Sequence, residues 1–373
     1  MKAAKLHTLV LFLSVGLTIL ACSILFARGE SPGRFAVVAY FHGNAADIEK
    51  YRIDRLTHIN FCFLHLQGNR LVVRSARDSM NIASLVSVKK RYPHVKVGLS
   101  FAGWGGCETC SDVFASKEGR HAFAESAKEI LQRFGADGID LDWEYPAIEG
   151  YPGHKYTPGD KENFTLLIQE LRAVLGKEYE ISFATGGFTD CLRKSVEWSR
   201  VMSLVDRVHV MTYDLVNGYS TVTGHHTPLY SSSYQRESTD NAVRLMDSLG
   251  VPVEKIIIGA AFYARVWEEV KSDRDGLFRE GKFKSYLLYR NLDQFFESNE
   301  GFEHHWDTTA QAPYSYNPQK QLFATFDDQR SITLKTQYAV RNRLGGIMFW
   351  ELSGDKLENG LLEAIDHAVK EPH

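Results

Sequence analysis

The chain has no run of lysine and arginine that could form a basic stripe. Its 373 residues include 43 basic and 46 acidic side chains, and the formal net charge is −3. Binding to nucleic acid needs a basic surface that neutralises phosphates, so we expect no nucleic-acid partner. With 44% hydrophobic residues, the chain can bury one large core or two ordinary ones.

The N-terminus lacks Asp, Glu, Lys and Arg from Leu6 to Ala27, directly after Lys2 and Lys5. This pattern predicts an export signal or a membrane anchor, which we assign to residues 1–30. The run of 22 residues exceeds the core of a usual signal and suffices to span a bilayer, so both outcomes stay open. Lipid attachment at Cys22 is a third alternative. In each case we expect the folded part outside the cytoplasm, secreted, periplasmic or attached to the membrane.

Cysteine is scarce, with five residues in the chain, and no zinc-binding pattern is complete. Cys107 and Cys110 could form half of a zinc site, but no second CxxC or spaced histidine pair completes it. A local disulfide between them is the better interpretation in an oxidising compartment. We expect Cys62 to be a buried thiol and Cys191 to be free. The adjacent histidines at 225–226 and 304–305 are interpreted as loop residues, so we expect no metal and no other cofactor.

Eight short apolar runs recur between amphipathic segments. Several are nearly continuous in hydrophobic residues, as parallel strands covered on both faces require. The segment 162–178 carries an apolar stripe at helical spacing, which ends at Gly176. Eight strands that alternate with helices predict a (β/α)₈ barrel rather than an open sheet. The runs are residues 35–41, 58–66, 95–104, 138–143, 180–187, 207–214, 255–263 and 345–352.

The gap between the seventh and eighth runs is more than twice the length of a usual strand and helix unit. Residues 266–326 in this gap are rich in aromatic residues and resemble a small α+β module. The barrel is assigned to residues 31–265 and 327–373. Because insertions after barrel strands build the catalytic face, we expect the module to wall a cleft, with a packing or dimerisation module as the alternative. We expect a monomer.

The segment GADGIDLDWEYP, residues 135–146, places four acidic residues in what is otherwise the pattern of a buried strand. Side chains of a strand alternate between faces, so Asp140, Asp142 and Glu144 share one face at intervals of roughly 7 Å. Like charges this close cannot all stay ionised when buried, so we expect at least one proton to be held or shared. Separated carboxyl pKa values indicate acid and base roles in catalysis. A solvated acidic edge strand is the alternative.

These residues resemble the signature of family 18 glycoside hydrolases, the chitinases. The stretch LSFAGW is similar to the family's Ser-x-Gly-Gly-Trp, although Ala102 replaces one glycine. Residues 266–326 resemble the module of the deep-cleft chitinase subgroup. The resemblance covers residues 34–365. The family pattern DxxDxDxE is complete here, as Asp137, Asp140, Asp142 and Glu144, with Gly138 inside it and Tyr145-Pro146 after it.

The resemblance implies that Glu144 is the general acid that protonates the glycosidic oxygen. No second carboxylate is an obvious nucleophile, and the family is an exception to the two-carboxylate scheme. The resemblance implies that the substrate's own acetamido carbonyl attacks the anomeric carbon. Asp142 would orient the acetamido group and stabilise its charge while sharing a proton with Asp140. Tyr213 would donate a hydrogen bond to the acetamido oxygen.

Other residues match family positions that contact the sugar chain. Trp350 would form the apolar floor beneath the sugar at the cleaved position, and Trp104 would offer a stacking surface nearby. Asp214 and Arg265 would bind sugar hydroxyls, with a structural ion pair as the alternative for Arg265. For three further tryptophans, Trp198, Trp267 and Trp306, we expect a core role. The remaining matches are Tyr40, Phe63, Met211 and Tyr263.

The sequence therefore predicts an exported chitinase that hydrolyses β-1,4-linked N-acetylglucosamine chains with retention, without metal or organic cofactor. Two alternatives stay open. One is a chitin-binding lectin without turnover, although such proteins usually lose the acid or the second aspartate, and both are present. The other is an endo-β-N-acetylglucosaminidase that cuts N-glycan cores, although the inserted module and the aromatic cleft suit a long linear polymer better.

Overall fold

The computed structural model describes residues 35–371 of the chain. The N-terminal apolar run and Cys22, for which export, anchoring and lipid attachment were predicted, lie outside these described residues. Within residues 35–371, no helix combines the length and the apolar character that crossing a membrane requires.

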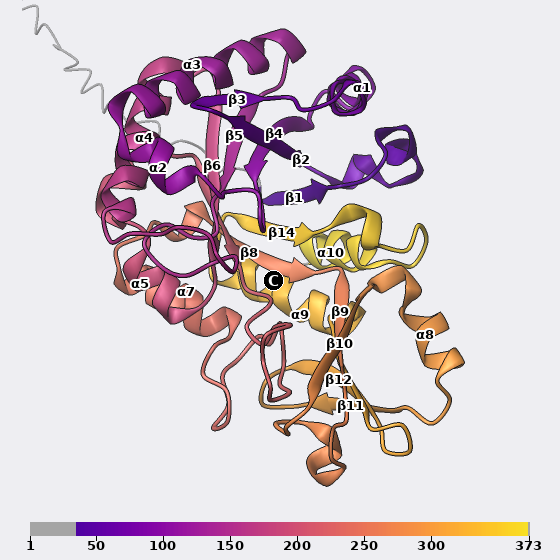
Figure 1. Cartoon of the computed structure of the whole chain (residues 1–373). Helices are drawn as coiled ribbons and strands as arrows, with labels where there is room; N and C mark the ends of the chain where they lie inside the picture. Colours follow the sequence, from indigo (N-terminus) through magenta and orange to yellow (C-terminus); the bar gives the residue numbers. More distant parts are fainter. Residues whose placement is uncertain (1–34, 372–373) are drawn as a thin grey trace, which may run out of the picture. The chain divides into compact units, whose positions relative to one another are not determined.

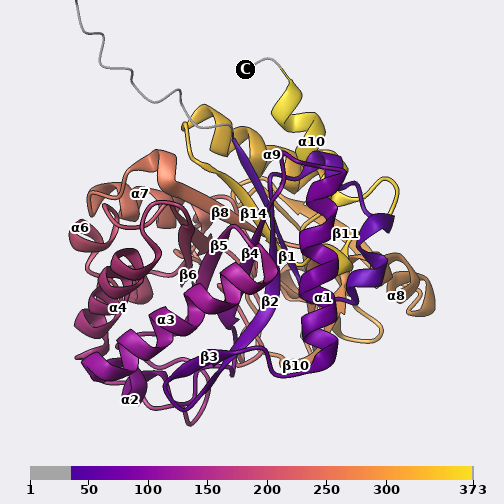
Figure 2. The same ribbon diagram turned by 90° about the horizontal axis from the view of Figure 1, so that it is seen from above.

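Eight parallel strands form a closed barrel, so the predicted (β/α)₈ fold is confirmed. The first strand pairs with both the second and the last, which closes the sheet. Figures 1 and 2 show the strands at the centre and the helices around them. The barrel strands are β1 (Ala36–Phe41), β2 (His58–Gln67), β4 (Lys96–Ala102), β5 (Gly138–Asp142), β6 (Glu180–Gly186), β7 (Arg207–Met211), β8 (Ile256–Ala261) and β14 (Gly346–Trp350).

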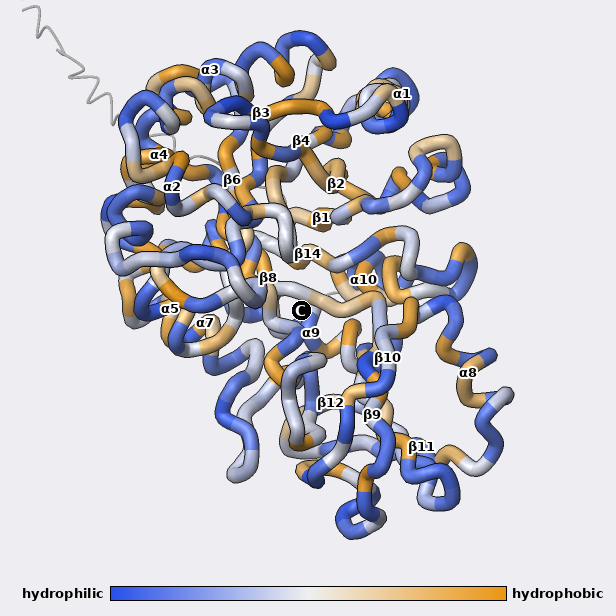
Figure 3. Tube along the Cα trace, viewed as in Figure 1, coloured by the Kyte–Doolittle hydropathy of each residue, from blue (hydrophilic) through white to orange (hydrophobic). Residues whose placement is uncertain are grey.

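The helices cover the outside of the barrel through amphipathic faces. In α4 (Asp160–Leu175), the predicted stripe is buried at Phe164, Ile168 and Leu171, and the helix ends at Gly176, whose φ is +66°. Figure 3 shows apolar residues gathered along the barrel strands and polar residues along the outer loops. The other α-helices of the barrel are α1 (Ala76–Ser87), α2 (Cys110–Ala115), α3 (Lys117–Phe134), α5 (Thr189–Lys194), α6 (Trp198–Val201), α7 (Thr239–Ser248), α9 (Gln329–Arg341) and α10 (Leu361–Lys370).

Several short elements complete the connections. A short strand, β3 (Arg70–Val72), forms a hairpin with β2. The 3₁₀ helices are η1 (Ala45–Lys50), η2 (Ile53–Arg55), η3 (Val88–Lys90), η4 (Val253–Lys255), η5 (Asp273–Gly276), η6 (Tyr289–Asn291) and η7 (Leu352–Gly354).

A five-stranded antiparallel sheet stands between β8 and β14, in the long gap between the seventh and eighth barrel strands. Figure 1 shows it beside the barrel, with α8 (Leu292–Ser298) at its outer side. The sheet starts at Tyr263 rather than at 266, because β9 follows β8 after a single residue. Its order is β10 (Lys282–Leu288), β9 (Tyr263–Glu268), β13 (Leu322–Thr325), β12 (Ala312–Asn317) and β11 (Glu303–Asp307).

The three tryptophans for which a core role was expected differ in their burial. Trp267 lies at the core of the inserted sheet and Trp198 in the barrel core, as expected. Trp306 is only partly buried, because it lies on the edge strand β11, where the guanidinium of Arg330 covers its ring at 3.7 Å. The expected core role is therefore wrong for Trp306.

The loop interpretation is wrong for one histidine doublet and confirmed for the other. His304 and His305 belong to β11, where neighbouring side chains point to opposite faces. His225 and His226 do lie in a loop, but both are buried. His226 lies beside the cleft residues described below.

Cys107 and Cys110 are joined by a disulfide that closes the loop between β4 and α2. Cys62 and Cys191 are both buried free thiols. Burial raises the pKa of each thiol, so neither is activated as a nucleophile at neutral pH.

Candidate active site

The carboxyl ends of the barrel strands open into a cleft of about 1580 Å³. Loops after β4, β5, β6 and β7 line one part of it, and the inserted sheet lines another through Arg265, Phe283 and Tyr286. Most of the residues predicted from the sequence meet here. They are Tyr40, Phe63, Trp104, Asp142, Glu144, Met211, Tyr213, Asp214, Tyr263, Arg265 and Trp350.

Asp140 lies beneath the cleft, fully buried inside the barrel. Its carboxylate accepts hydrogen bonds from the hydroxyls of Tyr40, Ser100 and Ser182 at 2.7–2.8 Å, and His209 Nδ1 lies 3.2 Å away. Burial alone would raise the pKa of Asp140, but the imidazole and these hydroxyls outweigh it and lower the pKa. Asp140 is therefore held as an ionised carboxylate.

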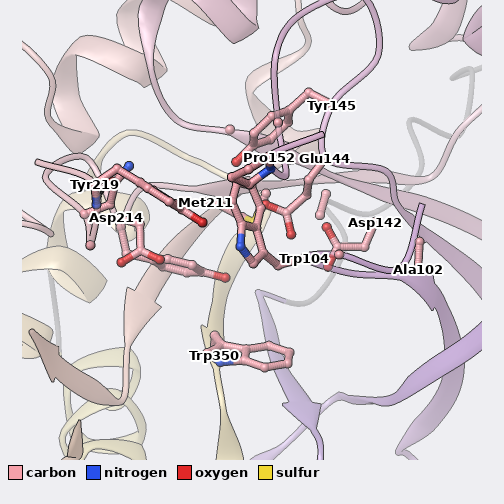
Figure 4. A pocket seen from close by; sticks show the side chains of 18 of the residues that line it. Ala102, Trp104, Asp142, Glu144, Tyr145, Pro152, Met211, Asp214, Tyr219 and Trp350 are labelled. Atoms are coloured by element: carbon pink, nitrogen blue, oxygen red, sulfur yellow. Dashed lines mark hydrogen bonds between the residues drawn. The ribbon is translucent and has the colours of Figure 1, made fainter. Parts of the chain in front are cut away.

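Asp142 and Glu144 point into the cleft above Trp350 (Figure 4). Burial and the charges of Glu144 and Asp140 raise the pKa of Asp142 well above its usual range. Its Oδ1 is buried without a hydrogen-bond partner, so this oxygen is available to a bound ligand. Because Asp140 is ionised and Asp142 is not stabilised as an anion, the proton that the crowded acids retain belongs on Asp142 rather than on Asp140.

Glu144 has the properties of an acid that works at neutral pH. Burial raises its pKa to about 7, the charge of Asp214 adds to this effect, and a hydrogen bond with Tyr145 opposes it. A carboxyl with this pKa can release and regain a proton near pH 7. Its place two residues beyond β5 is at the carboxyl end of a barrel strand, where barrel enzymes keep their chemistry.

Asp214 forms a bidentate ion pair with Arg265. Arg265 donates from Nε and Nη2 to its two carboxylate oxygens, each at 2.6 Å. His226 Nδ1 lies 3.7 Å from the same carboxylate. Burial would raise the pKa of Asp214, but the imidazole and the guanidinium lower it far below its ordinary value. Arg265 thus makes the ion pair that was the alternative to sugar binding, although both side chains also line the cleft.

An aromatic floor lies beneath the carboxyl groups. Trp350, at the end of β14, stacks on Phe63 with ring centroids 5.7 Å apart and an interplanar angle of 14°. Tyr213 stands nearby, with its hydroxyl 3.9 Å from the sulfur of Met348 in the barrel interior. Met211 lines the same floor. An apolar floor under a rim of carboxyls and hydroxyls is the arrangement that suits a sugar ring.

A second aromatic group stands at the rim. Trp104 is 46% exposed and lies between Tyr145, Tyr151 and Tyr219, at centroid distances of 5.6–6.4 Å. Its exposed face is free to stack on a sugar. The cleft therefore offers apolar surfaces both at its floor and along its edge.

Comparison with known proteins shows the family of the chain. A family model described as Glycosyl hydrolases family 18 matches residues 36–355. The chain belongs to this family. It is thus a glycoside hydrolase by family, and the recognition made from the four acidic residues is confirmed.

The family 18 relatives include both curated sequences and solved structures. Chitinase A1 of Niallia circulans is 32% identical over 305 residues, which is 74% of this chain but 43% of that protein. Chitinase B of Serratia marcescens is 26% identical, and the aligned region covers 86% of this chain and 77% of that protein. A family 18 N-acetylglucosaminidase from Paenibacillus barengoltzii has a TM-score of 0.81 at 33% identity, covering 90% of this chain and 99% of that one.

The family glycine that is Ala102 here keeps the backbone conformation of a glycine. Ala102 has φ +80°, and Gly103 follows with φ +73°. At Gly103 an added Cβ would lie 2.5 Å from the ring of Phe63, so this position needs glycine. Ala102 carries the strain of a positive φ, and its methyl group lines the cleft beside Asp142 (Figure 4).

Two residues of the family 18 signature lie away from the cleft. Asp137 accepts a hydrogen bond from Val97 N at 2.7 Å and pairs with Lys89 at the same distance. At Gly138 an added Cβ would lie 2.5 Å from the carbonyl oxygen of Glu180. Both residues stand at the start of β5, so they shape the strand that carries the acids rather than meeting a ligand.

Sequence reasoning missed several residues of the site. Ser182 and His209 both contact Asp140, and Phe188, Tyr219 and Tyr286 line the cleft. His209 had a usable signal, since it lies two residues before Met211 on β7 and thus on the same face. Tyr219 had none, because it comes from a loop without periodicity, whereas Tyr286 lies on the edge strand β10 of the inserted sheet.

The described residues contain one group that could gather around a metal ion, Asp275, Glu303 and His305. All three belong to the inserted segment, and none lines the cleft.

Proposed function

We propose that the protein is an exported chitinase that hydrolyses β-1,4-linked N-acetylglucosamine chains with retention, through attack by the substrate's own acetamido group. The observation that carries this proposal is the separation of the acid pKa values in the cleft. Glu144 can donate a proton near pH 7, whereas Asp142 holds one, and Asp140 and Asp214 are each fully engaged. The acids that surround Glu144 therefore offer no free carboxylate nucleophile.

In the first step, the acetamido carbonyl oxygen forms a bond to the anomeric carbon while the bond to the leaving oxygen breaks. Glu144 gives its proton to the leaving oxygen and becomes a carboxylate. The positive charge that appears on the cyclic oxazolinium ion lies beside Asp142. The Oδ1 of Asp142, which has no partner in the protein, accepts a hydrogen bond from the acetamido N–H. The ionised Asp140 beneath adds a negative charge without meeting the substrate.

In the second step, water attacks the anomeric carbon from the side that the leaving group vacated. Glu144 takes the proton of this water and returns to its acid form. The bond to the acetamido oxygen breaks, and the two inversions together give retention. Tyr213 donates a hydrogen bond to the acetamido oxygen, and Trp350 supports the apolar face of the same sugar.

The names of the relatives support chitin as the substrate class, since chitinases A1 and B are both chitinases. The P. barengoltzii relative favours a second candidate, an N-acetylglucosaminidase that releases single sugars. Timed digestion of chitin oligomers separates these two. Dimers and longer products support a chitinase, whereas monomers alone from the first time point support the second candidate.

The lectin and N-glycan alternatives need their own comparison. We expect turnover of chitin oligomers and no cleavage of a high-mannose glycoprotein. Binding without turnover of either would establish the lectin, and cleavage of the glycoprotein alone would establish the endo-β-N-acetylglucosaminidase.

The export proposal rests on the apolar run at residues 6–27. Mass spectrometry of the mature N-terminus tests it. A start near residues 28–31 means release, a lipid on Cys22 means a lipoprotein, and an intact run means an anchor. We also propose a monomer, because one chain supplies the whole cleft, and sedimentation at working concentration would reveal a dimer.

A further inference from the structure

A second, small cavity lies inside the barrel near the amino ends of its strands. Its volume is about 20 Å³, enough for one water molecule. Two buried polar atoms on its lining have no hydrogen-bond partner, Nδ2 of Asn60 and Nε2 of His209. The two residues are only 4% and 2% exposed. Leaving such groups without hydrogen bonds costs free energy, so the cavity favours a ligand that can form a hydrogen bond with both atoms.

The chain makes room for the amide of Asn60. Gly98 is its neighbour in register on β4, and a Cβ there would lie 2.3 Å from Asn60 Oδ1. Any other residue at position 98 would push the amide out of place. The orientation of Asn60 is thus built into the packing of two adjacent strands.

The contacts of His209 determine which ring nitrogen carries the proton. Nδ1 lies 2.8 Å from the Tyr40 hydroxyl oxygen and 3.2 Å from Asp140 Oδ1. Tyr40 gives its one proton to Asp140 Oδ2, at 2.8 Å. Both neighbours of Nδ1 are therefore acceptors, so Nδ1 carries a hydrogen. In the neutral ring, Nε2 is then an acceptor, and the amide nitrogen of Asn60 is a donor.

A water molecule matches this pair, since it can accept from Asn60 and donate to His209. We propose that a water in this cavity bridges Asn60 and His209, and that both are positioning residues for Asp140. The bridge holds the neutral ring with its proton on Nδ1, where it is donated towards Asp140 and Tyr40. The catalytic consequence rests on the proposed function, because Asp140 acts only through Asp142.

The two carboxylates on the lining of the cavity are each paired with cationic or N–H donors. Glu180 is engaged by Arg207 at 2.7 Å, by His58 at 3.1 Å and by Lys96. Asp137 is occupied by Lys89 and by a backbone N–H. No lining carboxylate among the described residues is thus left without a partner that could accept from Nε2.

Two substitutions separate a positioning role from a packing role. Asn60→Leu keeps the number and branching of the side-chain heavy atoms but removes the amide, so the bridge is lost and Nε2 stays unpaired. We expect kcat on a fluorogenic chitobioside to fall about tenfold with KM unchanged, as outer-shell partners of a site typically show. Asn60→Ser loses volume but keeps a hydroxyl and space for water, so kcat should stay within about twofold of the wild type.

A packing role predicts the opposite order, with Leu tolerated and Ser impaired, and that order would overturn the proposal. Thermal unfolding of both variants shows whether either fails to fold.

A second measurement does not depend on activity. Nitrogen-15 NMR of the histidine rings should show His209 neutral with its proton on Nδ1 in the wild type. The Leu variant should change this signal, and the Ser variant should preserve it. A proton on Nε2, or a charged ring at pH 7, would refute the bridge even in an active enzyme. Absence of chitobioside hydrolysis with the expected ring signal would instead refute the proposed function alone.

Discussion

Glu144 and Asp142 meet the same cleft, yet their neighbours give them different tasks. Burial raises the pKa of both, that of Glu144 to about 7 and that of Asp142 well above its usual range. Asp140 lies two residues before Asp142 on the same strand. Its pKa is lowered because an imidazole and three hydroxyl groups contact its carboxylate. These differences lead to two predictions for single residues.

Replacing Glu144 with Gln keeps the volume but removes the proton for the leaving oxygen. Turnover of a chitin oligomer should fall by about 10²–10⁴-fold, while binding survives. Asp140→Asn should cost less, because Asp140 acts through its neighbour, and Asp142→Asn should fall between the two or near Glu144→Gln. Turnover and a binding titration on the same preparations test this order. Near-wild-type turnover of Glu144→Gln would remove Glu144 from the acid role.

The pKa of Glu144 also predicts how activity and stability depend on pH. Because the acid must be protonated, kcat/KM should decline as pH rises above about 7. The pKa of Glu144 is higher in the folded protein than in the unfolded chain, where it is about 4.5. The contribution of Glu144 to the free energy of unfolding is therefore complete below about pH 4.5 and is lost as pH rises through about 7. Glu144→Gln should therefore unfold at a higher temperature than the wild type at pH 8, and this difference should shrink towards pH 4.5. A difference independent of pH would contradict the raised pKa.

At the scale of elements, the end of the inserted sheet is tied to the barrel by a fully buried ion pair. Asp327 follows β13, and its carboxylate lies 2.7 Å from Lys335 Nζ on α9. The same carboxylate accepts from Ala261 N at the end of β8. The Thr227 hydroxyl lies 3.2 Å from this carboxylate and 3.2 Å from the carbonyl oxygen of Thr212, and its one proton can go to either. The pair thus joins the inserted sheet to the strand ends that carry the site.

Lys335→Met should destabilise the protein by about 3–5 kcal/mol, because it leaves the Asp327 carboxylate buried without its partner. The matched control is Lys370→Met, which removes an exposed pair with Asp366 and should cost at most about 1 kcal/mol. Urea unfolding measures both free energies. Equal losses in the two variants would mean that burial does not govern these pairs.

At the scale of the whole molecule, the barrel and the inserted sheet together make one cleft, and in the proposed mechanism the nucleophile comes from the substrate. Glucose polymers of the same linkage lack the acetamido group, so their hydrolysis should be negligible beside that of chitin oligomers. A cyclic thiazoline that copies the charged intermediate should inhibit strongly. Parallel rate measurements on cellulose and chitin oligomers decide this, and comparable rates would exclude the acetamido mechanism.

Much of this architecture could be predicted from the sequence because its signals are local. Each predicted apolar run overlaps one barrel strand, and the excess length between the last two holds the inserted sheet. The alternation of side chains placed Asp140 and Asp142 on one face of β5. The predictions for Trp306 and for the doublet at 304–305 were wrong, because an edge strand of a small sheet has no strong period in the sequence.

The sequence by itself determined the barrel, the inserted segment and the acids that share a strand, since period and spacing follow from backbone geometry alone. Only the tertiary structure decided which acid keeps a proton. Ser100 and Ser182 flank Asp140 in register on the two neighbouring strands, while Tyr40 and His209 reach it across the closed barrel. A pKa depends on burial and on such partners, and these come from strands up to 100 residues away.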